Sequence, residues 1–276
     1  MLKKMKWLQL ALLSVLAVIL LAGCGGDNES DEGKNGGSKD NEKDMLTQIK
    51  ENDKIVFGVK NDTRLFGLKN PNTKEVEGFD IDIAKALAGE ILGDEEKVEF
   101  KEVTSKTRMP LLNNGDIDAI VATMTITEER KKEVDFTDVY FDAGQSLLVK
   151  KGSDIKGIDS LKGKKVLAVK GSTSAINIRE KAPEAEVLEF ENYSEAFAAL
   201  KSGQGDTLTT DDSILYGMVD EDPNYELVGG TFTDEPYGIA VKKGNEKFVD
   251  ELNKALKAIK DSGKYDEIHD KWIKKQ

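Results

Sequence analysis

Cysteine and histidine are almost absent from this sequence, whose 276 residues include only one of each. A lone cysteine, Cys24, has no partner for a disulfide within the chain. The lone histidine, His269 in YDEIHDKW, argues against a histidine-rich metal site and against a Ser-His-Asp triad. Its setting is typical of a helix surface. We therefore expect no metal, no cofactor and no catalytic residue.

Positive charge is also in short supply. Lysine and arginine number 40 against 52 aspartates and glutamates, which gives a formal net charge of -12. Nucleic acid binding needs a basic face, so nucleic acid is excluded as the main partner. A small charged ligand is not excluded, because the site that holds it can be basic within an acidic protein.

The first 23 residues have the layout of an export signal. Three lysines precede the apolar run WLQLALLSVLAVILLAG, which ends in small residues. A permanent transmembrane anchor is the alternative, because the run approaches the length of a membrane span. The segment LAGC at 21–24 resembles the lipoprotein box of bacteria, which implies cleavage before Cys24 and a lipid on its sulfur. We predict a signal peptide over 1–23 and stable attachment to the membrane through the acyl chains on Cys24.

Residues 24–44 are predicted to form a flexible tether. The stretch GGDNESDEGKNGGSKDNEKD contains no aliphatic or aromatic side chain. It cannot bury enough surface to offset the loss of chain entropy on folding. The folded part is therefore expected to begin near Met45.

Strand-like and helix-like stretches alternate in the folded part. Strands are expected at 54–59, 97–103, 118–122, 164–171, 186–190, 206–208 and 236–244. Helices are expected at 78–92, 108–115, 172–182, 194–203, 211–222, 245–263 and 265–275. The stretch TEERKKEV looks like the start of a further helix with Thr127 at its N-cap. This alternation is typical of parallel sheets flanked by helices.

A short pattern occurs twice in the chain. The sequence L-x-x-G-x-x-D-x-aliphatic is found at 112–120 and at 200–208, and each copy leads into a polar cluster. We interpret it as a sign of two α/β lobes of similar build. Ligands of such sheets lie at the carboxyl ends of the strands, so two lobes facing each other there form a cleft.

Five stretches carry a resemblance to a known family: GFDIDIAKALA, LLNNGDIDAIVATMTITEERKKEVDFT, LKGKKVLAVKGST, EPYGIAVKKG and GKYDEIHDKWI. From about residue 54 to 273, the chain resembles the extracytoplasmic solute-binding proteins of polar amino acid ABC importers. The resemblance implies an α/β, periplasmic-binding-protein-like fold of two lobes, each a mostly parallel sheet flanked by helices, joined by two hinge strands. It implies a monomer on the outer face of the cell membrane. Its partners would be a free polar L-amino acid and the permease subunits.

The expected hinges divide the folded part. They lie near 140–144 and 235–238, which gives lobe 1 as 45–142 together with 236–276, and lobe 2 as 143–235. In this family the amino acid is trapped between the lobes as they close.

A free amino acid carries a carboxylate and an ammonium, so burying it requires a cation with hydrogen-bond donors and an anion. Arg130 offers a fork for the carboxylate, and Asp211, in the other lobe, can meet the ammonium. From the residues alone, Arg130 also fits a solvated helix side chain and Asp211 an ordinary N-cap. The resemblance places the binding roles on these two positions. Further contacts are predicted from Thr123, Thr125, Lys170 and Thr173.

The side-chain end of the ligand is predicted to meet two cations. Lys60 follows the first strand and Arg108 lies in SKTRMP. These cations suit a carboxylate, as in aspartate- and glutamate-binding members with a similar K-x-D and K-T-R pattern. Asp62 is close enough to pair with either cation, and close relatives are often described as glutamine-binding. Glutamate, aspartate and glutamine therefore all stay open, and Phe66 is the only aromatic residue evident for stacking on the ligand.

Two other function classes are compatible with such a fold. One is an enzyme on the same fold, similar to prephenate or arogenate dehydratases, which needs a general acid or base in the cleft. The acids that can be placed there already have ligand-binding roles. The other is a sensor domain that acts through a partner. We expect a binding protein rather than an enzyme.

Overall fold

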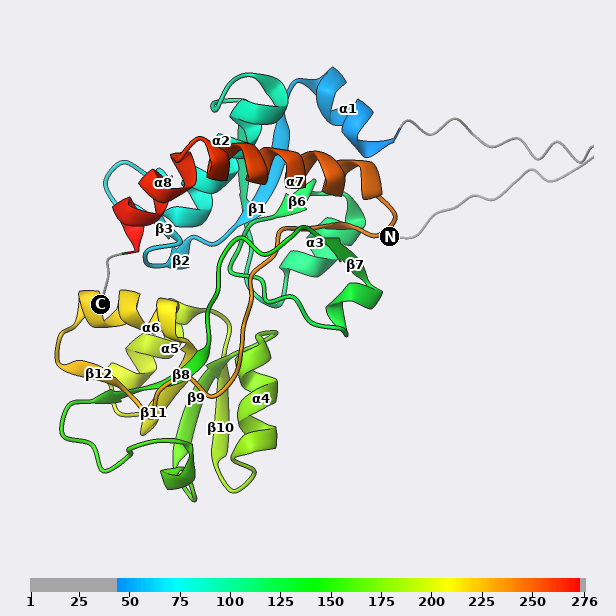
Figure 1. The fold of residues 1–276 in the computed structure, drawn as a ribbon. Helices are drawn as coiled ribbons and strands as arrows, with labels where there is room; N and C mark the ends of the chain where they lie inside the picture. Colours follow the sequence, from blue (N-terminus) through cyan, green and yellow to red (C-terminus); the bar gives the residue numbers. More distant parts are fainter. Residues whose placement is uncertain (1–43, 274–276) are drawn as a thin grey trace, which may run out of the picture. The chain divides into compact units, whose positions relative to one another are not determined.

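The computed structural model describes residues 44–273 (Figure 1). The predicted signal peptide, Cys24 and the tether up to residue 43 lie outside the described residues. The described part is mixed α/β with two separate five-stranded sheets, and the predicted two-lobed fold class is confirmed.

Lobe 1 contains a five-stranded sheet in the order β5-β1-β6-β13-β7. Its strands are β1 (Ile55–Val59), β5 (Val98–Glu102), β6 (Ala119–Ile120), β7 (Val134–Phe136) and β13 (Ala240–Lys242). A smaller sheet contains β2 (Asp62–Thr63), β3 (Gly67–Lys69) and β4 (Val76–Glu77). The helices of this lobe are α1 (Met45–Asn52), α2 (Phe79–Leu92), α3 (Arg108–Asn114), α7 (Glu246–Asp261) and α8 (Lys264–Trp272), with the 3₁₀ turn η1 (Arg130–Lys132).

Lobe 2 contains the second five-stranded sheet, in the order β10-β9-β11-β8-β12. Its strands are β8 (Gln145–Lys150), β9 (Lys165–Val169), β10 (Glu186–Phe190), β11 (Thr207–Asp211) and β12 (Tyr225–Val228). Its helices are α4 (Thr173–Lys181), α5 (Tyr193–Lys201) and α6 (Asp212–Glu221), with the 3₁₀ turn η2 (Ile158–Ser160). The strands and helices of lobe 2 run through the sequence much as predicted, but β8 and β12 were missed, as were α1, β2, β3, β4 and β7 in lobe 1.

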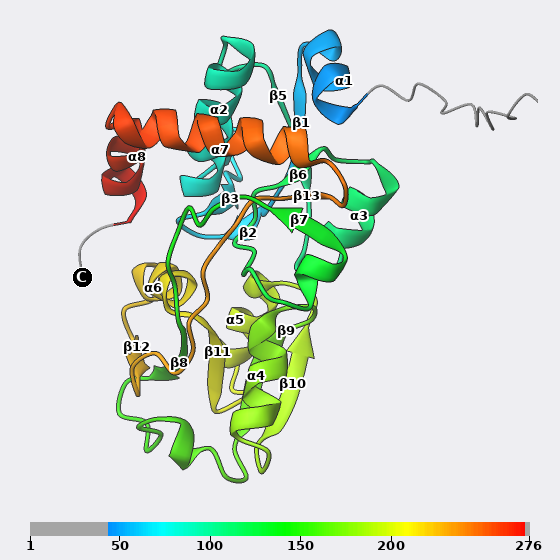
Figure 2. The same cartoon turned by 45° about the vertical axis from the view of Figure 1, so that its right-hand side comes forward.

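Each sheet joins parallel and antiparallel strands. β1 is parallel to β5 and β6, and β9 is parallel to β10 and β11. By contrast, β13 is antiparallel to β6, and β8 is antiparallel to β11. Both of these strands enter their lobe from a connection to the other lobe, and they therefore start where the parallel strands end. Figures 1 and 2 show the two connections side by side between the lobes.

The twice-occurring pattern has the same structural role in both lobes. Asp118 accepts a hydrogen bond from the backbone N–H of Val56 at 2.7 Å, and Asp206 accepts one from Lys165 at the same distance. Each aspartate thus ties the strand that follows it to the first parallel strand of its own lobe. The polar clusters after β6 and within β11 are thereby held at corresponding positions.

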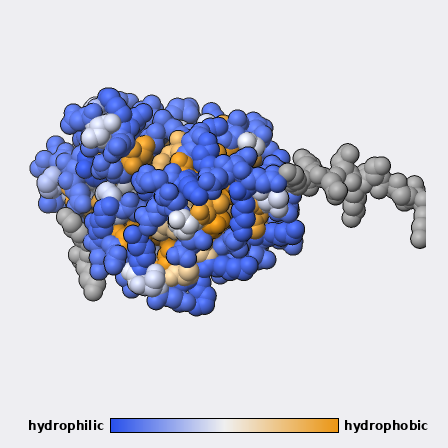
Figure 3. Space-filling view, turned by 90° about the horizontal axis from the view of Figure 1, so that it is seen from above, coloured by the Kyte–Doolittle hydropathy of each residue, from blue (hydrophilic) through white to orange (hydrophobic). Residues whose placement is uncertain are grey.

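The apolar residues of α2 show how the core forms. Phe79, Ile83 and Leu87, spaced four residues apart, are fully buried, as their helical spacing predicts. The face in Figure 3 is largely hydrophilic with small scattered hydrophobic patches. Among the described residues, Ile176 is the one large hydrophobic residue whose side chain is exposed. None of the helices within 44–273 has the length and apolar character to span a bilayer.

The expected helix at TEERKKEV is wrong in extent. Thr127 is not its N-cap, which is Glu129, although the Thr127 hydroxyl accepts a hydrogen bond from the Arg130 N–H at 3.1 Å. The helical geometry lasts only through the single turn η1, however, and the chain then enters β7. The backbone N–H and C=O groups that a longer helix would use are paired instead with β13, because residues 134–136 form β7. The lobe boundaries at 142/143 and 235/236 stay predictions.

Candidate functional site

The predicted cation Lys60 lies directly after β1 and is 1% exposed. Its ammonium donates a hydrogen bond to Ser105 Oγ at 2.8 Å and lies 5.0 Å from the centre of the Tyr193 ring, which belongs to lobe 2. Burial lowers the pKa of Lys60 to about 7. No ion pair joins Lys60 to another of the described residues, so it is available to a ligand.

The second predicted cation, Arg108, lies at the start of α3 and is 2% exposed. Its Nη1 donates to the carbonyls of Ala122, at 2.7 Å, and Thr123, at 3.3 Å. Its Nε has no hydrogen-bond partner among the described residues. Burial lowers the pKa of Arg108, and the charge of Arg130 acts in the same direction. Arg108 thus supports the loop after β6 and still has donors to offer.

Asp62 does not neutralise these cations by direct contact. Its Oδ2 accepts a hydrogen bond from the backbone N–H of Tyr193, at the start of α5, at 2.6 Å. The carboxylate therefore joins lobe 1 to lobe 2, where a helix N-terminus favours negative charge. The pairing of Asp62 with Lys60 or Arg108 considered from the sequence is not what the structure shows.

The loop after β6 presents the predicted threonines. Thr123 has a φ of 45°, an uncommon value for a residue with a side chain, and its N–H donates to Asp80 Oδ2 at 2.9 Å. The buried hydroxyl of Thr123 has no partner within residues 44–273. Thr125 Oγ1 lies 3.3 Å from Thr173 Oγ1 of the other lobe. Both threonines are buried, and Thr125 lies at the junction of the lobes.

Arg130 also lies between the lobes. Its Nη1 donates to the carbonyl of Thr125 at 2.7 Å, and its Nη2 donates to the carbonyl of Gly171, in lobe 2, at 3.2 Å. Burial lowers the pKa of Arg130, while the carboxylates of Glu235 and Asp211 oppose this shift. Two of its five N–H groups are used in these bonds, so the guanidinium retains donors for a carboxylate.

Asp211 ends β11 at the position before α6, but its side chain makes no capping hydrogen bond. Instead, Oδ2 accepts a hydrogen bond from the Tyr237 hydroxyl at 2.6 Å, and the buried Oδ1 has no partner among the residues described. Burial and the nearby Glu235 raise the pKa of Asp211 to about 7. A ligand ammonium would both satisfy Oδ1 and favour the ionised carboxylate.

Thr173 and Lys170 are placed differently from each other. Thr173 is the first residue of α4, and its hydroxyl donates to Glu235 Oε2 at 2.7 Å. The hydroxyl proton is therefore already used, and Thr173 presents lone pairs rather than a donor. The Lys170 side chain is 37% exposed, and its ammonium pairs with Glu191. The structure thus brings Thr173, but not the Lys170 ammonium, toward the other predicted site residues.

The two lobes approach closely around these residues. A methyl group placed on Gly171 would lie 2.8 Å from the Lys106 Cα, and one placed on Gly217 would lie 2.9 Å from the Arg64 carbonyl oxygen. Both glycines belong to lobe 2, and both neighbours belong to lobe 1. The predicted site residues are mostly shielded from water, which strengthens electrostatic interactions among them, but Arg130 and Thr173 are only partly buried.

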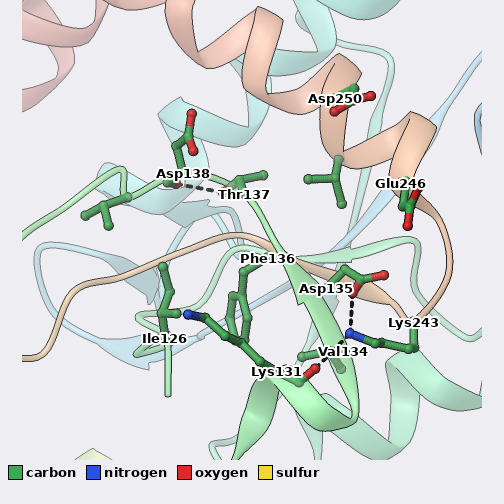
Figure 4. A pocket seen from close by; sticks show the side chains of 12 residues that line it. Ile126, Lys131, Val134, Asp135, Phe136, Thr137, Asp138, Lys243, Glu246 and Asp250 are labelled. Carbon is green, nitrogen blue, oxygen red and sulfur yellow. Dashed lines mark hydrogen bonds and ion pairs between the residues drawn. The ribbon is translucent and has the colours of Figure 1, made fainter. Parts of the chain in front are cut away.

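A separate surface pocket of about 610 Å³ lies in lobe 1 alone (Figure 4). It is lined by β7 residues and by the start of α7, and it includes none of the predicted ligand-binding residues. Lys243 pairs there with Asp135 at 2.6 Å, as the dashed line in Figure 4 shows. Within residues 44–273, no cluster of three or more potential metal ligands occurs. The arrangement at the lobe junction is therefore the candidate site.

Residues 55–275 match the bacterial extracellular solute-binding proteins, family 3. The chain belongs to this family. The ABC transporter glutamine-binding protein GlnH of Bacillus subtilis (strain 168) is 71% identical to this family 3 protein over 98% of this chain and 97% of the relative. The glutamine-binding protein of Geobacillus stearothermophilus is 59% identical over 89% of this chain and 95% of the relative.

Solved structures agree with the family assignment. An ancestral arginine-binding protein bound to glutamine is 47% identical, covers 80% of this chain and 98% of its own, and superposes with a TM-score of 0.76. The family 3 protein is a solute-binding protein rather than an enzyme, so the dehydratase-like alternative is not retained. The sensor alternative stays a prediction.

Several residues at the site were missed from the sequence. Ser105 and Tyr193 contact Lys60, whereas Tyr237 and Glu235 contact Asp211 and Thr173. The signal for the last two was a glutamate and a tyrosine within the expected hinge EPYG. Phe66, considered for stacking on the ligand, is fully buried and packs against Phe141, with ring centres 5.2 Å apart.

Proposed function

We propose that this protein captures glutamine outside the cell and delivers it to the permease subunits of an ABC importer. The observation that carries the proposal is the 71% identity, over nearly the whole chain, to a glutamine-binding protein of such a transporter. The candidate site supports it, because the site offers a separate partner for each polar group of an amino acid.

Each end of glutamine has a counterpart in the buried site. Arg130 receives the α-carboxylate, and Asp211 Oδ1 receives the α-ammonium. Lys60 and Arg108 donate hydrogen bonds to the oxygen of the side-chain amide. A neutral amide accepts these bonds without requiring that either cation be neutralised. The support for glutamine over glutamate comes from two relatives, both of which are named glutamine-binding proteins.

Isothermal titration of the purified protein with each of the common amino acids tests this function. We expect glutamine to bind at one molecule per chain and more tightly than glutamate or aspartate. Binding of no amino acid would overturn the proposed function. Tightest binding of glutamate would overturn the specificity while leaving the transport class in place.

Lys60→Met is expected to weaken glutamate more than glutamine. Glutamine loses one hydrogen bond from a charged donor, about a tenfold effect, whereas glutamate loses a buried charge pair, about a hundredfold effect. Titration of both ligands against both proteins gives the two ratios. The matched control is Lys170→Met, which removes an exposed pair with Glu191 and should leave both affinities within about twofold. Equal losses for the two ligands in Lys60→Met would contradict a contact with the ligand side chain.

Protonation of Asp211 is expected to weaken glutamine binding as the pH drops below about 7. Without ligand, Asp211 has a pKa of about 7, so it is largely protonated at lower pH. An ammonium ligand favours the ionised carboxylate, so binding at low pH must release this proton, which by itself raises Kd by about tenfold per pH unit. Lys60, whose pKa is lowered to about 7, gains a proton when it donates to the ligand amide and offsets part of this rise. Titrations of Lys60→Met between pH 5.5 and 8 measure the slope without this opposing group, and a flat affinity in that variant would contradict an ionic contact with Asp211.

We also propose that the protein is a monomer held at the outer face of the cell membrane by a lipid on Cys24. The support is the LAGC segment, in which the only cysteine stands at the position that lipid attachment requires. The tether over 24–44 would then separate the lipid from the folded part.

A further inference from the structure

The connection that returns from lobe 2 to lobe 1 passes directly beside the candidate site. Its residues Glu235 and Tyr237 are 2% and 0% exposed. The N–H of Tyr237 donates to Phe141 O at 2.8 Å, and the N–H of Tyr140 donates to Tyr237 O at 3.0 Å. The backbone at Tyr237 is therefore fixed against the outgoing connection. Figure 2 shows the two connections side by side.

The Tyr237 side chain is fixed as firmly as its backbone. Its ring stacks on Phe141 with centres 5.5 Å apart and meets the edge of Phe66 at 5.9 Å. Its hydroxyl donates to Asp211 Oδ2 at 2.6 Å and lies 3.4 Å from Ser213 Oγ. The donor thus has a set position relative to the carboxylate.

This hydrogen bond divides the two oxygens of Asp211 between two tasks. Oδ2 is used by Tyr237, whereas Oδ1 is buried and has no partner among the described residues. We propose that Tyr237 is a positioning residue for the amino-group site, which holds the Asp211 carboxylate so that Oδ1 alone faces the ligand ammonium. The part of this inference that concerns the ligand rests on the proposed function.

Glu235 gives an independent parallel on the same connection. Its Oε2 accepts the hydroxyl proton of Thr173 at 2.7 Å. Its Oε1 accepts hydrogen bonds from Asn177 Nδ2 at 2.8 Å and from Thr233 Oγ1 at 2.9 Å. Two side chains of one connection thus orient two polar residues of lobe 2, which links the geometry of the connection to the geometry of the site.

The other groups around Asp211 define what a change at Tyr237 can do. Glu235 and Asp212 raise the pKa of Asp211, whereas Arg130 and the Tyr237 hydrogen bond lower it. Tyr193 also lies within reach of the Asp211 charge, because burial and then this charge raise the pKa of the Tyr193 hydroxyl. Removal of the Tyr237 hydroxyl leaves these neighbours in place and takes away a bond that favours the ionised carboxylate.

Tyr237→Phe tests the inference in two measurements. Carbon NMR of the Asp211 carboxyl, without ligand, should show a higher pKa in Tyr237→Phe than in the wild-type protein. Titration with glutamine at pH 7 should show an affinity about tenfold lower, and the pH at which binding weakens should move upward. The matched control is Tyr265→Phe, which removes another tyrosine hydroxyl bond of 2.6 Å, to Tyr140 O, outside the lobe 2 site. It should change neither the carboxyl pKa nor the pH profile.

The outcomes separate the inference from the proposed function. An unchanged Asp211 pKa in folded Tyr237→Phe overturns the positioning role, whether or not glutamine binds. A uniform loss of affinity at every pH also overturns it, because a general structural defect would not move the midpoint. If the unchanged protein binds no amino acid, the proposed function fails, and the NMR measurement still decides the role of Tyr237.

Discussion

Arg130→Met is expected to weaken glutamine binding by at least about thirtyfold. Removing one partner of a buried, hydrogen-bonded charge pair costs roughly 2–5 kcal/mol, because the other charge is left without a partner. Here the unpaired group would be the ligand carboxylate. Two N–H groups of Arg130 already hold the carbonyls of Thr125 and Gly171, so the guanidinium is oriented before the ligand arrives. Isothermal titration of the variant measures the loss.

The neighbouring residue supplies a matched control for this prediction. Lys131 undergoes the same substitution one position along the turn, but its side chain is 49% exposed and pairs with Glu128 at 2.7 Å. Lys131→Met should keep its affinity within about twofold. Arg130→Lys should recover part of the binding, because it restores the charge but not the planar fork. Full affinity in Arg130→Met would show that another group receives the carboxylate.

The elements that were predicted well depend on local patterns. The helical spacing of Phe79, Ile83 and Leu87 specified α2 within a residue of its observed bounds, and Gly115 ends α3 in the left-handed conformation expected of a cap. β8, by contrast, was missed. Its residues Gln145–Lys150 follow the outgoing connection directly, and its antiparallel pairing with β11 is made only after the chain has crossed between lobes. No local pattern distinguishes it from the hinge.

The residues of the candidate site were likewise predicted only in part. The chemistry of an amino acid demands a cation and an anion, so Arg130 and Asp211 were accessible from residue type and position at strand ends. The contacts of Tyr237 and Glu235 depend on how the returning connection crosses the site, which is a property of the tertiary structure. The partner of Asp62 could not be predicted for the same reason, because it is a backbone N–H of the other lobe.

Asp211→Asn is expected to weaken glutamine binding by about a hundredfold or more. The substitution keeps the shape of the side chain and an oxygen that accepts the Tyr237 hydrogen bond, but it removes the charge that balances the ligand ammonium. The part of the pH dependence of binding that Asp211 contributes below about pH 7 should disappear with it. Asp220→Asn is the matched control, because Asp220 is exposed on α6, the helix that directly follows Asp211. It should retain both the affinity and the pH dependence.

The same substitution should stabilise the protein when no ligand is present. Burial raises the pKa of Asp211 from 3.8 to about 7, so the folded state holds a proton in this window that the unfolded state has lost, and stability falls as the pH rises through it. At pH 8 the wild-type protein contains a buried carboxylate charge that Asn lacks. Asp211→Asn should therefore melt at a higher temperature at pH 8, and this difference should vanish below about pH 4. A variant that loses both glutamine affinity and melting temperature would instead indicate a damaged fold. A variant that loses affinity but melts at a higher temperature would show that the Asp211 charge destabilises the protein and is needed for binding.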